Sequence, residues 1–191
     1  MISKYWNKSP LGLFKAIYLI TKVFLVFTYE KINSFFWKFN LSNSVENLMI
    51  QKGTQIRFPK NISFAKNTSI GRDVVISSEI KDSILVCKEN FVIAKEVTLD
   101  FTGDVFIGKN VLISEKTVIL SHDHGYDPNS KPKKSRLDID DNVWIGQNSL
   151  IMPNVNKIGK NSIIAAGSVV TKDVEENSIF AGNPAKKIKA L

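Results

Sequence analysis

Cysteine and histidine are scarce in this chain, and each shortage excludes a class of protein. The 191 residues include one cysteine, Cys87, so no internal disulfide can form, which is typical of a reducing compartment. Only two histidines are present, so one chain cannot supply a zinc site built from three. The dipeptides Asn-Gly and Asp-Gly, which favour tight β-hairpins, are missing. A β-sandwich of hairpin-linked strands is therefore disfavoured.

Positive charge is in excess, and it is unevenly distributed. The formal net charge is +8. Residues 1–40 contain one acid, Glu30, against six lysines: Lys4, Lys8, Lys15, Lys22, Lys31 and Lys38. A second basic cluster comprises Lys131, Lys133, Lys134 and Arg136. Such clusters indicate anionic partners, either a membrane surface or a phosphate-bearing cofactor. No nucleic-acid-binding motif accompanies them, so we expect no nucleic-acid partner.

A large aliphatic residue recurs every six positions over much of the chain. The pattern is strongest between Ile139 and Val170, and it returns at Ile107, Ile113 and Ile119. Weaker or earlier rungs are Ile56, Ile62, Ile70, Ile76, Ile93, Leu99 and Val105. Six residues suit one short strand and a corner, and three such sides form a triangular coil that buries the aliphatic residue.

The repeat predicts an all-β fold with a simple division of the chain. We expect a parallel β-helix over residues 56–175, interrupted by a protruding loop over 120–138. Residues 41–55 are expected to be a connector. Residues 176–191 are expected to form a turn and tail with a short C-terminal helix.

The N-terminal segment, residues 1–40, is predicted to be an apolar α-helix. Ser9 resembles an N-cap, and Pro10 suits the first helical position. Lys15 and Lys22 fall on one helical face while apolar residues cover the rest, which favours a helix lying on a membrane surface. Three alternatives stay open: a transmembrane span with Lys22 near its middle, a signal peptide lacking a small-residue cleavage site, and packing against protein.

The loop over residues 120–138 contains both histidines, His122 and His124. A loop that interrupts a regular solenoid is usually functional, and histidine can act as a general base near neutral pH. An ordinary polar loop is one alternative. A metal site is another, but it needs a third ligand from a carboxylate or another subunit. We assign no metal to the chain.

Several motifs together resemble the hexapeptide-repeat acyltransferases. They are the rungs, the histidine-bearing loop, and the runs Ala-Ala-Gly-Ser-Val-Val-Thr-Lys-Asp-Val over 165–174 and Ala-Gly-Asn-Pro-Ala over 181–185. The chain is most similar to the maltose- and galactoside-type O-acetyltransferases and their polysaccharide-modifying relatives. The resemblance implies a left-handed parallel β-helix, a homotrimer with active sites between subunits, and acetyl-CoA as co-substrate.

The resemblance also implies roles for the residues of the loop. Ungapped alignment from Asn110 places the catalytic base of the family at His124, with His122 second. Asp127, or a main-chain carbonyl, is expected to hold the imidazole tautomer. A backbone N–H at the corner near Trp144–Gly146 is expected to stabilise the oxyanion. The γ-type carbonic anhydrases share this β-helix, but they need three histidines per site.

Coenzyme A binding is implied at a further set of positions. They are Trp144, Gly146, Gln147, Ala166, Thr171, Lys172, Lys186 and Lys189. The last two stand where relatives often have arginine, and lysine meets phosphate as a point charge without the bidentate fork. The asparagine with which the maltose and galactoside enzymes contact sugar is missing, since the matching offset reads Ile-Ala-Lys-Glu over 93–96. The acceptor should therefore differ from theirs.

The sequence thus predicts an acetyl-CoA-dependent O-acetyltransferase. We expect its acceptor to be a sugar hydroxyl of a cell-surface polysaccharide or of its lipid-linked precursor. Acyl transfer to a soluble small molecule (an antibiotic, serine or a nucleotide-linked amino sugar) is the alternative. The expected location is the cytoplasm, at the inner face of the plasma membrane.

Overall fold

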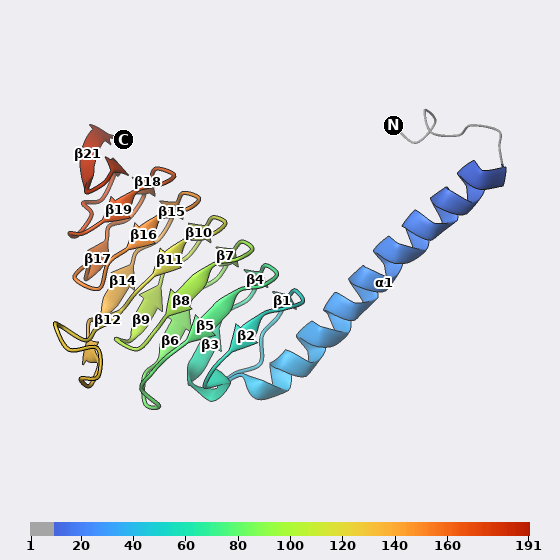
Figure 1. Cartoon of the computed structure of the whole chain (residues 1–191), viewed down its shortest axis with the longest axis horizontal. Helices are drawn as coiled ribbons and strands as arrows, with labels where there is room; N and C mark the ends of the chain where they lie inside the picture. The colour runs from blue at the N-terminus through green and yellow to red at the C-terminus, as the bar shows by residue number, and fades with distance from the viewer. Residues whose placement is uncertain (1–9) are drawn as a thin grey trace.

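The computed structural model describes residues 10–191, which form one long helix followed by a β-solenoid (Figure 1). Helix α1 spans Pro10–Asn40, and the solenoid of about 7 turns follows it. The N-cap assigned to Ser9 lies outside the described residues. In Figure 1 most of α1 extends away from the solenoid, and only its C-terminal end approaches strand β1.

Three sheets form the sides of the solenoid, and each of the first five coils contributes one strand to each side. Sheet A contains β1 (Met49–Ile50), β4 (Ser69–Ile70), β7 (Val92–Ile93), β10 (Leu112–Ile113), β15 (Trp144–Ile145), β18 (Ile163–Ile164), β20 (Ser178–Gly182) and β21 (Ala185–Ala190). Sheet B contains β2 (Gln55–Ile56), β5 (Val75–Ser77), β8 (Thr98–Asp100), β11 (Val118–Ile119), β16 (Leu150–Ile151) and β19 (Val169–Val170). Sheet C contains β3 (Ile62–Phe64), β6 (Leu85–Cys87), β9 (Val105–Ile107), β14 (Leu137–Ile139) and β17 (Lys157–Ile158). A short 3-10 helix, η2 (Pro59–Asn61), precedes β3.

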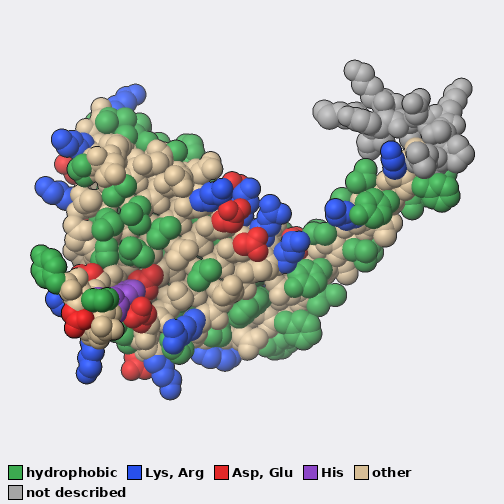
Figure 2. Space-filling model, in the orientation of Figure 1, with side chains coloured by type: hydrophobic (Ala, Val, Ile, Leu, Met, Phe, Trp, Pro, Cys, Tyr) green, Lys and Arg blue, Asp and Glu red, His purple; other side chains and the backbone are tan. Residues whose placement is uncertain are grey.

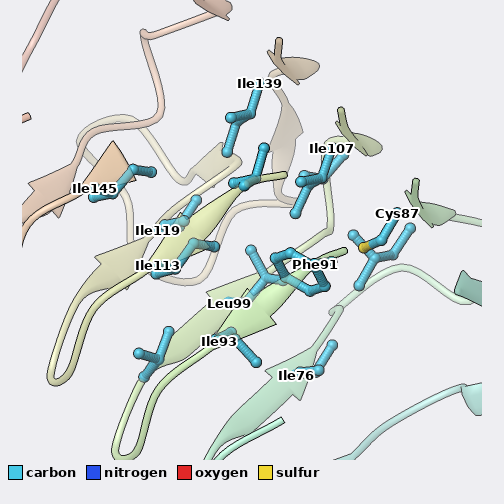
Figure 3. Close-up of a cluster of buried hydrophobic side chains, with 14 of the residues drawn as sticks. Ile76, Cys87, Phe91, Ile93, Leu99, Ile107, Ile113, Ile119, Ile139 and Ile145 are labelled. Carbon is cyan, nitrogen blue, oxygen red and sulfur yellow. The ribbon is translucent and has the colours of Figure 1, made fainter. Parts of the chain in front are cut away.

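The aliphatic rungs point into the solenoid from all three sheets (Figure 3). Pairing is parallel and in register, so Ile113 stacks between Ile93 and Ile145 along the axis. Each of these three side chains is at most 1% exposed. The hexapeptide period is therefore the period of burial, and stacking of coils is what removes the rungs from water.

A column of asparagines closes one corner of every coil. Each has a positive φ, which asparagine tolerates better than other non-glycine residues. Each side-chain amide donates to the side-chain oxygen of the next asparagine, at 2.8–2.9 Å. The column comprises Asn47, Asn67, Asn90, Asn110, Asn142, Asn161 and Asn177. These side chains therefore satisfy one another along the axis.

Two details differ from the expected division of the chain. Strand β1 lies within residues 41–55, so the first coil begins in the segment expected to be a connector. The expected C-terminal helix is wrong, because β20 and β21 form an antiparallel pair. Strand β20 continues sheet A beside β18, and Phe180, 8% exposed, fills the core like another rung. Pairing with that sheet edge outweighs the helical preference of the lysine-rich tail.

Helix α1 caps the open end of the solenoid through its last turns. The side chain of Asn33 donates to the carbonyl of Ile50 at 2.9 Å, and the buried Ser34 accepts from the Ile50 N–H at 2.8 Å. Trp37 packs against the core. Earlier in the helix the large apolar side chains are exposed, as Figure 2 shows along its length. By length and composition α1 is also apolar enough to cross a membrane.

Candidate active site

The two histidines lie where the chain leaves sheet B after β11. The loop there contains the strand pair β12 (His122–Asp123) and β13 (Lys133–Lys134), so it is a short hairpin projecting from the solenoid. The two imidazole rings lie edge to face, with centroids 5.2 Å apart. Figure 2 shows them beside acidic side chains at the surface.

His122 is held by the carboxylate of Asp100. Its Nδ1 lies 2.8 Å from Asp100 Oδ2, and its side chain is only 13% exposed. An ionised carboxylate can only accept, so Nδ1 carries a proton, and in the neutral imidazole Nε2 presents a lone pair. His122 is therefore fixed in orientation and in tautomer.

Asp100 is a buried carboxylate, and both of its oxygens accept hydrogen bonds. Its oxygens accept from the backbone and hydroxyl of Ser121, from Thr102 and from His122. Burial by itself would raise the pKa of Asp100, but these hydrogen bonds outweigh burial and hold the pKa below its ordinary value. An ionised Asp100 thus connects the coil below to the histidine loop.

His124 has a different partner on the same side of its ring. Its Nδ1 lies 2.7 Å from the carbonyl oxygen of Ser130, and the Ser130 hydroxyl donates to the His124 carbonyl at 2.6 Å. A carbonyl oxygen accepts only, so Nδ1 is protonated, and in the neutral imidazole Nε2 is the acceptor. The side chain is 28% exposed, which leaves Nε2 reachable from solvent.

Asp127 does not have the role expected of it. Its carboxylate accepts from the Asn129 N–H at 2.9 Å and closes a local turn at the tip of the loop. The imidazole of His124 is held by a main-chain carbonyl instead, which was the other expectation. Asp127 is exposed and stabilises the turn that brings Ser130 to His124.

Glu79 faces both histidines. Its Oε1 lies 3.4 Å from His122 Nε2, and its Oε2 lies 3.4 Å from His124 Nε2. Glu79 follows β5 and Asp100 ends β8, and both strands stack below β11 in sheet B. Neither acid was predicted from the sequence. Asp100 pairs with Ser77 in sheet B, and Glu79 follows Ser77 by two residues, so both acids lie near the same end of stacked strands, but this signal required knowing which rungs stack.

The expected coenzyme A residues are divided between two parts of the solenoid. A pocket on the outer face of sheet A is lined by Trp144, Gly146, Gln147 and Ala166, and the indole Nε1 of Trp144 donates to Ser114 at 2.9 Å. The cross-strand register extends from Trp144 through β18 and β20 to Lys189. Six of the eight residues therefore belong to this face and its upper end.

A register shift in β21 places the two C-terminal lysines on one face. Lys189 pairs with Ile179 and Lys186 with Ala181, on either side of the irregularity at Ile179 and Phe180. Directly opposed residues share a face, and residues two apart in a strand do too, so Lys186 and Lys189 point outward together. The other two residues, Thr171 and Lys172, follow β19 at the edge where the histidine loop also begins.

The expected oxyanion contact is wrong. The Trp144 N–H donates to the Ser162 carbonyl at 3.1 Å, and the Gly146 N–H donates to the Ile164 carbonyl at 2.8 Å. Both amides are therefore consumed by coil-to-coil pairing. A Cβ added to Gly146 would lie 2.6 Å from the backbone of Ile164, so glycine is required for this close approach.

The basic cluster over residues 131–136 is partly neutralised within the loop. Arg136 forms two hydrogen bonds of 2.8 Å with Asp138 and lies over the Phe106 ring, 4.3 Å from its centroid. Lys134 lies 3.5 Å from Asp104. These contacts fasten the returning arm of the loop to the solenoid.

Comparisons with known proteins identify similar sequences and structures. No protein-family model matches the chain. The chain is 30% identical over 153 residues to WbbJ of Escherichia coli strain K12, which is named as a lipopolysaccharide biosynthesis O-acetyl transferase. The match covers 70% of this chain and 77% of WbbJ.

Two solved structures share the fold. One is AntD, an N-acyltransferase from Bacillus cereus solved with dTDP-4-amino-4,6-dideoxyglucose and coenzyme A, with a TM-score of 0.68, 25% identity, and coverage of 80% of this chain and 86% of AntD. The other is the hexapeptide-repeat acetyltransferase VCA0836 from Vibrio cholerae, with a TM-score of 0.61, 24% identity, and coverage of 85% and 81%. The left-handed parallel β-helix predicted from the sequence is confirmed.

Proposed function

Since the chain belongs to the hexapeptide-repeat acetyltransferase family, we propose that it transfers the acetyl group of acetyl-CoA to a sugar hydroxyl of a cell-surface polysaccharide or its lipid-linked precursor. The observation that carries the proposal is the state of His124, whose Nδ1 proton is committed to the Ser130 carbonyl. Its Nε2 lone pair is left free to take a proton from a hydroxyl.

The proposed reaction is a direct displacement through a tetrahedral intermediate. His124 Nε2 accepts the proton of the acceptor hydroxyl while that oxygen attacks the thioester carbonyl. The intermediate collapses to the ester and expels the thiolate of coenzyme A, which takes the proton back from the imidazolium. General-base assistance of this kind contributes about 10²–10⁴-fold in rate. No acyl-enzyme is needed, and the single thiol, Cys87, is buried.

A homotrimer with sites between subunits accounts for the division of the coenzyme A residues. In one chain the Trp144 face belongs to sheet A, whereas His124 follows sheet B. Packing sheet A of one copy against the histidine edge of another would unite them. This arrangement is testable by complementation: mixing inactive His124→Gln chains with inactive Trp144→Asp chains should restore transfer. If sites lie within single chains, the mixture stays inactive.

Helix α1 supports a location of the protein at a membrane surface. Lys15 and Lys22 share a helical face with Asn33, and Asn33 contacts the first coil of the solenoid. Apolar side chains on the opposite face, such as Ile17 and Phe24, are 51% and 65% exposed. A lipid surface on that side would cover them while leaving the solenoid on the aqueous side. A lipid-linked acceptor would meet the enzyme there.

Two observations support a glycan hydroxyl as acceptor: the likeness to WbbJ, and the exposed apolar helix α1, which on a membrane would place the enzyme beside lipid-linked sugars. The test is to incubate the full chain, acetyl-CoA and membranes that contain lipid-linked oligosaccharide, and to follow release of coenzyme A. Mass spectrometry should then find alkali-labile acetyl esters on the saccharide. Absence of esters when coenzyme A is released would contradict O-acetylation.

The likeness to AntD favours one second candidate, N-acylation of a nucleotide-linked amino sugar. The same assay separates the two reactions. An amide survives mild alkali, whereas an ester does not, and the amine reaction needs no membrane. Transfer to a soluble dTDP-linked amino sugar, with an alkali-stable product, would favour this candidate.

A further inference from the structure

We propose that Glu79, His122 and His124 form a binding site for Zn²⁺, and that occupation of this site switches acetyl transfer off. The regulatory half of the proposal rests on the proposed function, whereas the binding half does not. One ligand atom from each residue can be chosen so that all lie within 4.8 Å of one another. From the sequence, a metal site in the histidine loop lacked a third ligand. Glu79 supplies a carboxylate beside the two histidines.

The three groups present lone pairs to one another. Both Nδ1 protons are committed, to the Asp100 carboxylate and the Ser130 carbonyl, so both Nε2 atoms are acceptors. Each Nε2 lies 3.4 Å from an oxygen of Glu79, which also only accepts when ionised. Lone pairs that converge in this way repel unless a proton or a cation lies between them. The cluster is therefore arranged as a cation receptor.

Two of the separations match the ligand spacing of a tetrahedral ion. Zn²⁺ binds imidazole nitrogen and carboxylate oxygen at about 2.0–2.2 Å, which puts neighbouring ligand atoms of a tetrahedron about 3.3–3.5 Å apart. The two distances between Glu79 oxygens and the Nε2 atoms are 3.4 Å. Each distance joins a different Glu79 oxygen to its imidazole, and one ligand atom per residue keeps all three within 4.8 Å, so the half-exposed Glu79 side chain must move to bring one oxygen close to both imidazoles.

The surroundings also fit a metal site. Metal-binding histidines usually donate their other ring proton to a carboxylate or carbonyl, and His122 and His124 do so with Asp100 and Ser130. The side chains of His124 and Glu79 are 28% and 48% exposed, so solvent can deliver the ion and occupy a fourth position. Two neutral imidazoles favour Zn²⁺, Co²⁺, Ni²⁺ or Cu²⁺ over Mg²⁺ or Ca²⁺.

Zn²⁺ bound at this site would inhibit acetyl transfer by blocking the catalytic base. Coordination uses the Nε2 lone pairs of His122 and His124, and a coordinated His124 cannot accept the proton of an acceptor hydroxyl. Binding of the acceptor and binding of Zn²⁺ would then exclude each other. Removal of the ion by a chelator restores the base.

Metal binding is tested directly on the chelator-treated full chain. Titration with Co²⁺ should give the intense visible absorption of a tetrahedral ion, and Zn²⁺ should displace it at one ion per chain. Glu79→Gln should weaken binding at least about tenfold, and Asp100→Asn should weaken it about 10–100-fold. Asp82→Asn is the matched control, because Asp82 is an exposed acid three residues further along the same loop. Equal affinity in wild type and Glu79→Gln would overturn the site.

Regulation is tested separately from binding. Zn²⁺ at saturation should lower wild-type coenzyme A release at least about tenfold, with recovery on adding chelator, and Asp82→Asn should behave alike. In Glu79→Gln the ratio of rates with and without Zn²⁺ should stay close to one at that concentration. Zn²⁺ binding with undiminished or faster transfer would overturn the switch. If the chain transfers acetyl groups but binds no Zn²⁺, the metal site is wrong and the proposed function stands. If the chain binds Zn²⁺ but transfers no acetyl group under any condition, the metal site stands, and the proposed function and its regulation are wrong.

Discussion

Asp100 Oδ2 and His122 Nδ1 lie 2.8 Å apart, and this contact joins two coils of the solenoid at the base of the histidine loop. The carboxylate belongs to β8, and the imidazole begins β12, one coil above. The neighbouring His124 is held by a carbonyl rather than a carboxylate. The two histidines are thus positioned by different chemistry, so variants can separate their roles.

Asp100→Asn should destabilise the protein by about 1–3 kcal/mol. The amide can replace only one of the acceptor oxygens, and its NH₂ would face donors from Ser121 or Thr102. Urea unfolding measures the loss, and Asp82→Asn, an exposed acid, should change stability little. An Asp100→Asn protein as stable as wild type would contradict the role given to this carboxylate.

Two substitutions of Asn110, in the middle of the asparagine column, should destabilise the protein to different extents. Asn110 accepts from Asn90 at 2.8 Å, donates to Asn142 at 2.9 Å and has a φ of 56°. Asn110→Gly loses the hydrogen bonds but tolerates the backbone, and should cost about 1 kcal/mol. Asn110→Ala also strains the backbone and should cost about 1–2 kcal/mol more. Equal unfolding free energies for the two variants would contradict the importance of the left-handed conformation.

Cys87 should make stability depend on alkaline pH. Burial raises the pKa of this thiol well above its ordinary value of 9.0. In the unfolded chain the thiol ionises near that value, while in the folded chain it stays neutral. Its contribution is therefore complete below pH 9.0 and declines as pH rises toward the folded pKa.

The comparison is between wild type and Cys87→Ala. Raising the pH from 8 to 10 should lower the unfolding free energy of wild type by about 1 kcal/mol more than that of the variant. The absolute stability of Cys87→Ala will be lower because of the cavity, so only the two pH differences are compared. Identical pH differences would mean that burial does not perturb this thiol.

Deleting residues 1–32 should release the protein from membranes. The deletion removes the exposed apolar length of α1 but keeps Asn33, Ser34 and Trp37, which cap the first coil. The shortened protein should therefore stay folded by circular dichroism and appear in the soluble fraction. Alkaline carbonate should also extract the full chain, because a surface helix is not anchored by a span. Resistance to carbonate would favour the transmembrane alternative.

The sequence predicts the solenoid well because its signal is periodic. Each rung, such as Ile113, has the same environment as the next, so one pattern predicts many contacts. The tail was wrongly expected to be helical, because only the sheet edge offered by β18 makes a strand of residues 178–182. Local sequence does not reveal that partner.

The site was only partly predictable for a similar reason. His122 and His124 stand out because they interrupt the repeat, and they are indeed adjacent in space. Glu79 and Asp100 come from earlier coils and reach the loop through stacking, which depends on the lengths of the corners between rungs. Asp127 was one of two expected partners because the resembled family often has an acidic residue three positions after the base, yet its carboxylate accepts from the backbone of its own turn.

The most direct test of the account is the rate of coenzyme A release by His124→Gln, measured beside wild type and His122→Gln on chelator-treated protein with the membrane acceptor. His124→Gln should lower the rate by about 10²–10⁴-fold without changing the unfolding midpoint, since this side chain is partly exposed and Gln can still donate to the Ser130 carbonyl. His122→Gln should retain more activity. A His124→Gln enzyme with wild-type rate, or loss of transfer only in His122→Gln, would contradict the assignment of His124 as the base.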